Sequence, residues 1–114
     1  MARSAIPDPL KRRHLVESPL DPARARRIAE AYLAENRRLE AIDFLRKAGD
    51  TERLATLRQE AADEGHVFLL RAVCAAAGDP PDAALWEHTA RAAARAGREL
   101  DALEAERQVA RLRS

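Results

Sequence analysis

The side chains best suited to acid–base, metal or nucleophile chemistry are three histidines and one cysteine: His14, His66, His88 and Cys74. A helical zinc pair needs His, Asp or Glu at a four-residue spacing plus further ligands, whereas His88 has an alanine there. Cys74 lies in an apolar stretch, where cysteine behaves as a small hydrophobic residue, and Arg71 is the one cation placed to lower its pKa. No glycine-rich phosphate loop or Gly-x-Ser-x-Gly turn occurs. We therefore expect no enzymatic activity, no metal site and no cofactor.

Arginine is the most abundant charged side chain, with 18 copies against two lysines. Its planar guanidinium can donate two parallel hydrogen bonds to one carboxylate. The chain holds 20 basic and 19 acidic residues, a net charge of +1, whereas a nucleic-acid-binding domain normally has a clear basic excess. The arginines therefore favour acidic protein groups as partners or a solvated helical surface. Nucleic-acid binding through Lys11-Arg12-Arg13 and the arginines of the segment 22–35 stays the alternative.

The elements that carry these side chains are predicted to be helices, because the 114 residues include 26 alanines and 14 leucines and few β-branched residues. Asp8-Pro9 and Asp21-Pro22 are typical helix starts, and Asp50 and Asp79 can cap helices that follow them. The expected stops are Asn36, Gly49, Gly65, Gly78 and Gly97. The resulting helices are 22–35, 38–48, 51–64, 66–77, 82–96 and 98–112, with a short one at 9–17. Short connections make consecutive helices antiparallel.

Apolar residues recur at three- and four-residue steps, which predicts one buried face per helix. The residues expected on these faces include Ile28, Tyr32, Leu39, Leu45, Leu57, Trp86, Leu100, Leu103 and Leu112. The helix 66–77 differs, because it is apolar nearly all round and is expected to be buried on several sides.

The three predicted hairpins are similar to one another. Their turns at Asn36, Gly65 and Gly97 are 29 and 32 residues apart. Each hairpin has apolar or small residues at matching positions on both sides of its turn. In the first hairpin these are Ala25, Ile28, Ala29 and Tyr32 before the turn and Ala41, Leu45 and Ala48 after it. In the second they are Leu54, Leu57 and Ala61, then Cys74 and Ala77, and in the third Trp86, Ala90 and Ala93, then Ala102 and Val109. This pattern resembles the tetratricopeptide repeat (TPR) family over about residues 22–112. The departures are Arg58, Leu70, Thr89 and Glu106.

The resemblance implies an all-α chain, folded as a right-handed superhelix of about three antiparallel hairpins at 22–48, 51–77 and 82–112. A HEAT-like array is the alternative geometry. In the TPR family the first helices line a concave groove that holds a partner protein or peptide, so we expect a protein–protein interaction adaptor. By the alignment, the groove residues are Arg26, Arg27, Glu30, Gln59, Asp63, His88, Arg91 and Arg95. A solvated surface with helical pairs such as Arg26–Glu30 and Glu87–Arg91 is the competing interpretation.

The segment 1–20 is expected to be separate from the repeat domain 21–114. It can form a short helix that covers Ile28 or Tyr32, act as a linear motif, or be partly disordered. A homodimer and a structural role inside a larger complex also stay open. No apolar run approaches the ~20 residues of a membrane span, and the N-terminus has no apolar signal region. We expect a cytoplasmic protein, and the alanine and arginine bias suggests a bacterial one.

Overall fold

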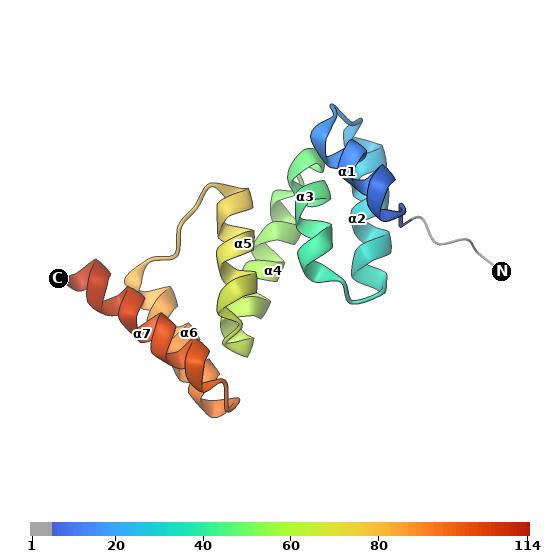
Figure 1. Cartoon of the computed structure of the whole chain (residues 1–114). Helices are drawn as coiled ribbons and strands as arrows, with labels where there is room; N and C mark the ends of the chain where they lie inside the picture. The colour runs from blue at the N-terminus through green and yellow to red at the C-terminus, as the bar shows by residue number, and fades with distance from the viewer. Residues whose placement is uncertain (1–5) are drawn as a thin grey trace. The chain divides into compact units, whose positions relative to one another are not determined.

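The computed structural model describes residues 6–114, a range that is helical and contains no strand (Figure 1). The expected all-α class is confirmed. The helices are α1 (Pro9–Glu17), α2 (Pro22–Ala34), α3 (Arg38–Ala48), α4 (Thr51–Glu64), α5 (Val67–Ala77), α6 (Ala83–Arg95) and α7 (Glu99–Arg113). Each end lies within one residue of the expected position. None of the helices in this range has the length and apolarity needed to cross a bilayer.

Local capping explains where the helices begin and end. The carboxylates of Asp8 and Asp21 accept the backbone N–H of Lys11 and Arg24, at 2.9 and 3.1 Å. Asn36 and all four glycines have positive φ, as the turns require. The expectation that Asp79 caps a helix was wrong: two prolines separate it from α6, and Asp82 caps α6 instead, accepting from the Leu85 N–H at 2.8 Å. Asp79 pairs with Arg58 at 3.5 Å.

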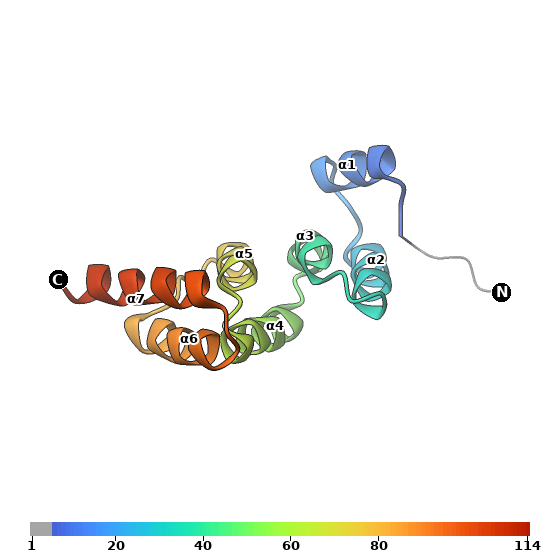
Figure 2. The same cartoon turned by 60° about the horizontal axis from the view of Figure 1, so that its bottom comes forward.

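By packing, the chain divides within α4 into two compact units, residues 1–54 (unit 1) and 55–114 (unit 2). In unit 1, α2 and α3 form a tight antiparallel pair (Figure 2), which α1 contacts through the side chain of Arg12. The core of the pair is the stack of Tyr32 on Phe44, whose ring centroids are 5.8 Å apart. The Arg12 guanidinium lies 5.5 Å from each ring centroid and donates to the Glu40 carbonyl at 2.9 Å. Cation–π and hydrogen-bond contacts therefore fasten α1 to the pair.

In unit 2, α6 and α7 form the second tight antiparallel pair (Figure 2). Trp86 is its largest buried side chain, 3% exposed. Gly65, in the turn between α4 and α5, lies against the backbone of Ala93 so closely that a Cβ there would be 2.3 Å from the Ala93 nitrogen. Thr89 fills an apolar position of the TPR pattern, and its buried hydroxyl is satisfied because it donates to the Leu85 carbonyl at 2.7 Å.

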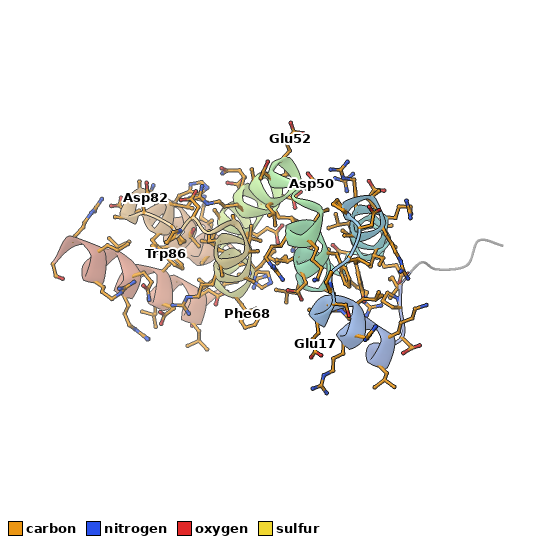
Figure 3. All side chains as sticks on the ribbon, turned by 90° about the horizontal axis from the view of Figure 1, so that it is seen from above. Glu17, Asp50, Glu52, Phe68, Asp82 and Trp86 are labelled. Atoms are coloured by element: carbon orange, nitrogen blue, oxygen red, sulfur yellow. The ribbon has the colours of Figure 1, made fainter. Side chains whose placement is uncertain are left out.

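Two burial predictions were wrong. The first concerns α5, which is not buried all round: Phe68 is 67% exposed and its side chain points away from the helices (Figure 3). The second concerns leucines expected on buried faces that are exposed instead: Leu39, Leu100, Leu103 and Leu112. The buried residues of α7 are the small Ala102 and Ala105. The helix therefore packs through alanines, and the leucines on either side of them stay exposed.

Candidate functional site

Three of the eight predicted groove residues, Arg26, Arg27 and Glu30, belong to unit 1 and lie exposed on α2. The Arg26–Glu30 pair that the competing interpretation of a solvated surface named is not among the ion pairs of the described residues. Arg26 pairs with Asp50 at 3.6 Å, and Glu30 pairs with Arg53 at 3.3 Å. Both partners lie around the start of α4, so these two residues tie α2 to that start. Arg27 has no ion pair within residues 6–114.

The other five predicted residues belong to unit 2, and the structure brings three of them together. The Asp63 carboxylate on α4 accepts from Gln59 at 2.9 Å and contacts His88 Nε2 on α6 at 2.6 Å. Arg91 lies 3.8 Å from Glu87, a pair that the competing interpretation of a solvated surface named, and Arg95 is exposed without an ion pair in the described part of the chain. We call this set of five side chains the α4–α6 face: Gln59, Asp63, His88, Arg91 and Arg95.

Hydrogen bonding sets the charge state at the centre of the α4–α6 face. The contact with His88, and secondarily the hydrogen bond from Gln59, lowers the pKa of Asp63 below its ordinary value. Asp63 therefore stays ionised over a wider pH range than an isolated aspartate. The face therefore has one fixed carboxylate, at Asp63, and two exposed cations, Arg91 and Arg95, about one and two turns further along α6 from His88.

A hollow of about 350 Å³ opens in unit 1 between α1, the residues before it, and α2. Its apolar lining comes from Ile6, Pro7, Leu15 and Ile28. The charged lining consists of Lys11, Arg24 and Arg27, with no carboxylate. We call this the α1–α2 hollow.

A second hollow, of about 430 Å³, lies in unit 2 between the end of α5, the segment 78–81 and α7. Trp86, Cys74 and Leu112 supply apolar lining, and Arg71 and Arg111 supply cations. We call it the α5–α7 hollow. Burial raises the pKa of the Cys74 thiol, which keeps it protonated and unreactive at neutral pH. The cation that partly opposes this rise is Arg58 rather than Arg71, because Arg58 reaches Cys74 from α4.

Sequence reasoning missed both hollows, although one signal for the first was present. Lys11 and Arg24 each occupy the third residue of a helix that begins with Asp-Pro, in the repeated pattern Asp-Pro-x-basic at 8–11 and 21–24. The α5–α7 hollow has no comparable signal, because it depends on how far α7 runs beside α5.

Among residues 6–114, no group of three His, Cys, Asp or Glu side chains lies together where it could hold a metal ion. The arrangement therefore offers carboxylate and guanidinium groups on helix surfaces and two shallow hollows with apolar linings. The fold class of the described residues is all-α, with helices packed in antiparallel pairs. In comparisons with known proteins, no family, curated protein or solved structure matches the chain significantly.

Proposed function

We propose that the chain is a non-enzymatic protein–protein interaction module, a TPR-like array of helical hairpins that binds a partner protein or peptide through the outward faces of α2, α4 and α6. The observation that supports this best is the α4–α6 face. The contact between Asp63 and His88 joins two first helices of predicted hairpins into one surface.

The chemistry of that surface favours a partner with acidic groups. His88, Arg91 and Arg95 follow one another at three- and four-residue steps, so they form one stripe along α6. The guanidinium of Arg95 has no internal carboxylate among the described residues, and Arg91 is 63% exposed with its partner at 3.8 Å. Both arginines can therefore donate forked hydrogen bonds to carboxylates of a bound peptide.

The experiment is an affinity pull-down from nuclease-treated lysate of the organism's own cells. It compares wild type with Arg91→Glu/Arg95→Glu and with the control Arg13→Glu/Arg46→Glu, which reverses the same number of charges on α1 and α3. We expect a protein that wild type and control retain and the Arg91/Arg95 variant loses. Equal retention by all three would show that the α4–α6 face is not the binding site.

A structural subunit of a larger complex is the second candidate, favoured by the exposed apolar side chains of unit 2. Phe68, Leu100 and Leu103 are 67, 81 and 50% exposed, and a partner that covered them would remove this apolar surface from water. For this candidate, Phe68→Ser/Leu100→Ser should abolish retention of a partner while leaving the far-ultraviolet circular dichroism unchanged. Retention that depends on Arg91 and Arg95 alone would exclude it.

A further inference from the structure

The α1–α2 hollow is lined by three cations that form no ion pair with the residues the structure describes. No ion pair within residues 6–114 involves Lys11, Arg24 or Arg27. The two nearest carboxylates in the sequence, Asp8 and Asp21, act as helix caps and accept backbone N–H groups. These two carboxylates keep their charge but make no ion pair with the three cations, and neither belongs to the lining of the hollow, which is basic.

The floor beneath these cations is apolar and well packed. Leu15 and Ile28 are each 6% exposed, and Ile6 and Pro7 are half-buried. The hollow's volume of about 350 Å³ lies within the lower part of the range of small-ligand sites, about 300–1,000 Å³. A hollow of this size accepts one large apolar side chain while charged neighbours of that side chain remain at the rim.

We propose that the α1–α2 hollow binds an acidic peptide segment of a partner protein, with one large apolar side chain on the Leu15–Ile28 floor and flanking carboxylates on Lys11, Arg24 and Arg27. Charge complementarity selects this occupant. The hollow's lining carries three cations and no carboxylate, which matches a segment whose residues beside the apolar side chain are acidic. The site rests on the proposed function and deepens it: it shares Arg27 of α2 with the predicted groove, but it uses neither Arg91 nor Arg95, so the two can be tested separately.

The energetics predict binding that depends on both salt and the apolar anchor. Rim charges are solvent-exposed and screened within about 8 Å at physiological ionic strength, so added salt weakens their attraction. The apolar side chain contributes independently of salt, by removing surface from water. A peptide that has only one of the two features should therefore bind more weakly than one that has both.

The test is fluorescence anisotropy of the full chain with a labelled peptide, Asp-Glu-Glu-Leu-Glu-Glu-Asp. Two peptide controls replace the central leucine with serine or every acidic residue with its amide. The protein variant is Lys11→Glu/Arg24→Glu/Arg27→Glu, and the matched control, Arg13→Glu/Arg46→Glu/Arg107→Glu, makes the same change in net charge elsewhere.

We expect reversal in the hollow to raise Kd more than about tenfold and the control to change it less than about threefold. The milder Lys11→Gln/Arg24→Gln/Arg27→Gln should give an intermediate Kd, and circular dichroism checks that each variant is folded.

Four results would overturn the proposal. The first is a wild type that does not bind the leucine peptide, and the second is equal binding by the wild type and the reversed hollow. The third is loss of binding with Arg91→Glu/Arg95→Glu but not with the hollow variant, which would leave the proposed function standing and move the site to the α4–α6 face. The fourth is a chain that does not bind the peptide but binds phosphatidylserine vesicles, or associates with itself, in a way that the charge reversal of Lys11, Arg24 and Arg27 abolishes.

Discussion

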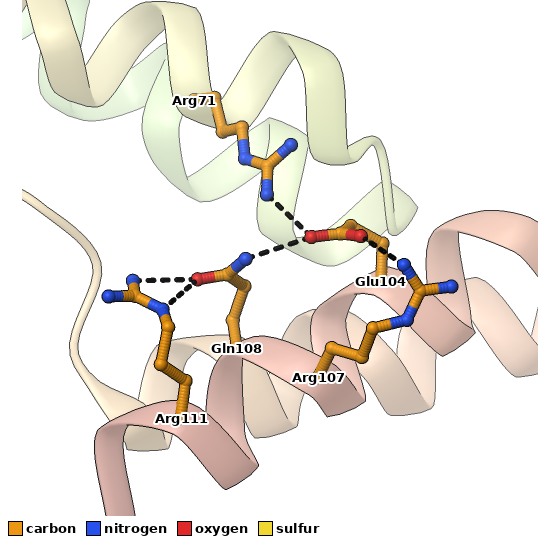
Figure 4. Close-up of polar contacts among 5 residues, drawn as sticks. All are labelled: Arg71, Glu104, Arg107, Gln108 and Arg111. Atoms are coloured by element: carbon orange, nitrogen blue, oxygen red, sulfur yellow. Dashed lines mark hydrogen bonds and ion pairs between the residues drawn. The ribbon is translucent and has the colours of Figure 1, made fainter.

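Both hollows are lined by arginines, but the side chains of those in the α5–α7 hollow have hydrogen-bond partners within the chain and, among the described residues, those of the α1–α2 hollow do not. In the α5–α7 hollow, Arg71 donates to Glu104 at 2.7 Å, Gln108 donates to the same carboxylate at 2.8 Å, and Arg111 donates to Gln108 at 2.8 Å (Figure 4). These residues form one chain of hydrogen bonds that links α5 to α7. In the α1–α2 hollow, by contrast, the three cations have no such partners within residues 6–114.

The difference shows that the number of cations in a hollow does not measure what is available to a ligand. Arg71 also lies 5.7 Å from the Trp86 ring centroid, so its guanidinium is engaged by both an anion and an aromatic face. A carboxylate ligand would have to displace Glu104 from Arg71, whereas at Lys11 or Arg24 it would displace only water. We therefore interpret the arginines of unit 2's hollow as structural and those of unit 1's hollow as ligand-binding.

The largest expected effect tests whether α5 really forms a packed wall of unit 2. Leu70 is fully buried on α5, so Leu70→Asp should cost more than about 4 kcal/mol of the free energy of unfolding, because it buries an unpaired charge. Phe68→Asp is the control on the same helix, and at 67% exposure it should leave the thermal midpoint nearly unchanged. Thermal unfolding followed by circular dichroism measures both. If Leu70→Asp were tolerated, α5 would not be packed and the α5–α7 hollow would have no fixed wall.

The second effect compares helix-ending glycines of the two units. Gly49 and Gly65 have φ of 66° and 69°, so an alanine at either position costs about 1–2 kcal/mol. Open space surrounds Gly49, whereas the Ala93 backbone lies where the Cβ at Gly65 would be. Gly65→Ala should therefore cost at least about 1–3 kcal/mol more than Gly49→Ala in denaturant unfolding. Equal costs would contradict the close approach of the α4–α5 turn to α6.

The sequence predicted the helices well because their signals are local. Asp8 and Asp21 start helices through side-chain hydrogen bonds to nearby N–H groups, and Asn36 and the glycines end helices through their positive φ, so both signals are local in the sequence. The apolar spacing also predicted Tyr32, Leu45 and Trp86 correctly as buried.

What the sequence could not predict depends on contacts between helices. Leu100 and Phe68 lie at apolar helical spacing, yet they are 81 and 67% exposed, because periodicity does not report whether a neighbouring helix exists. The partners of Arg26 and Arg58 were missed for a similar reason, since Asp50 and Asp79 are 24 and 21 residues further along the chain. Whether an arginine is free or engaged is a tertiary property, and the two hollows differ in that property.

The third prediction measures that difference directly by neutralising one cation in each hollow. Arg71→Gln should lower stability by about 0.2–1 kcal/mol, because it removes a partly exposed ion pair with Glu104. Arg24→Gln should change stability by less than about 0.5 kcal/mol, since its side chain has no ion-pair partner to lose among residues 6–114. Urea unfolding of the two variants gives both values. A loss at Arg24 equal to that at Arg71 would mean that the α1–α2 cations are structural after all.

The smallest expected effect is a change in the pKa of Asp63 on the α4–α6 face, which a pH titration measures. Contact with His88 and Gln59 lowers the pKa of Asp63 in the folded chain. The unfolded chain lacks these contacts, so they favour folding above the ordinary aspartate pKa, and this contribution is lost as the pH falls through the lowered value. His88→Ala should therefore move the Asp63 pKa back up toward the ordinary value, with Gln59→Ala producing a smaller rise in the same direction. Carboxyl-carbon NMR titration of Asp63 measures each shift, and Asp101, on α7 and paired with Arg98 instead, serves as the internal control. If the titration midpoint of Asp63 did not respond to His88→Ala, α4 and α6 would not share a face in solution. Arg91 and Arg95 would then be separate surface charges on α6 rather than parts of one binding face.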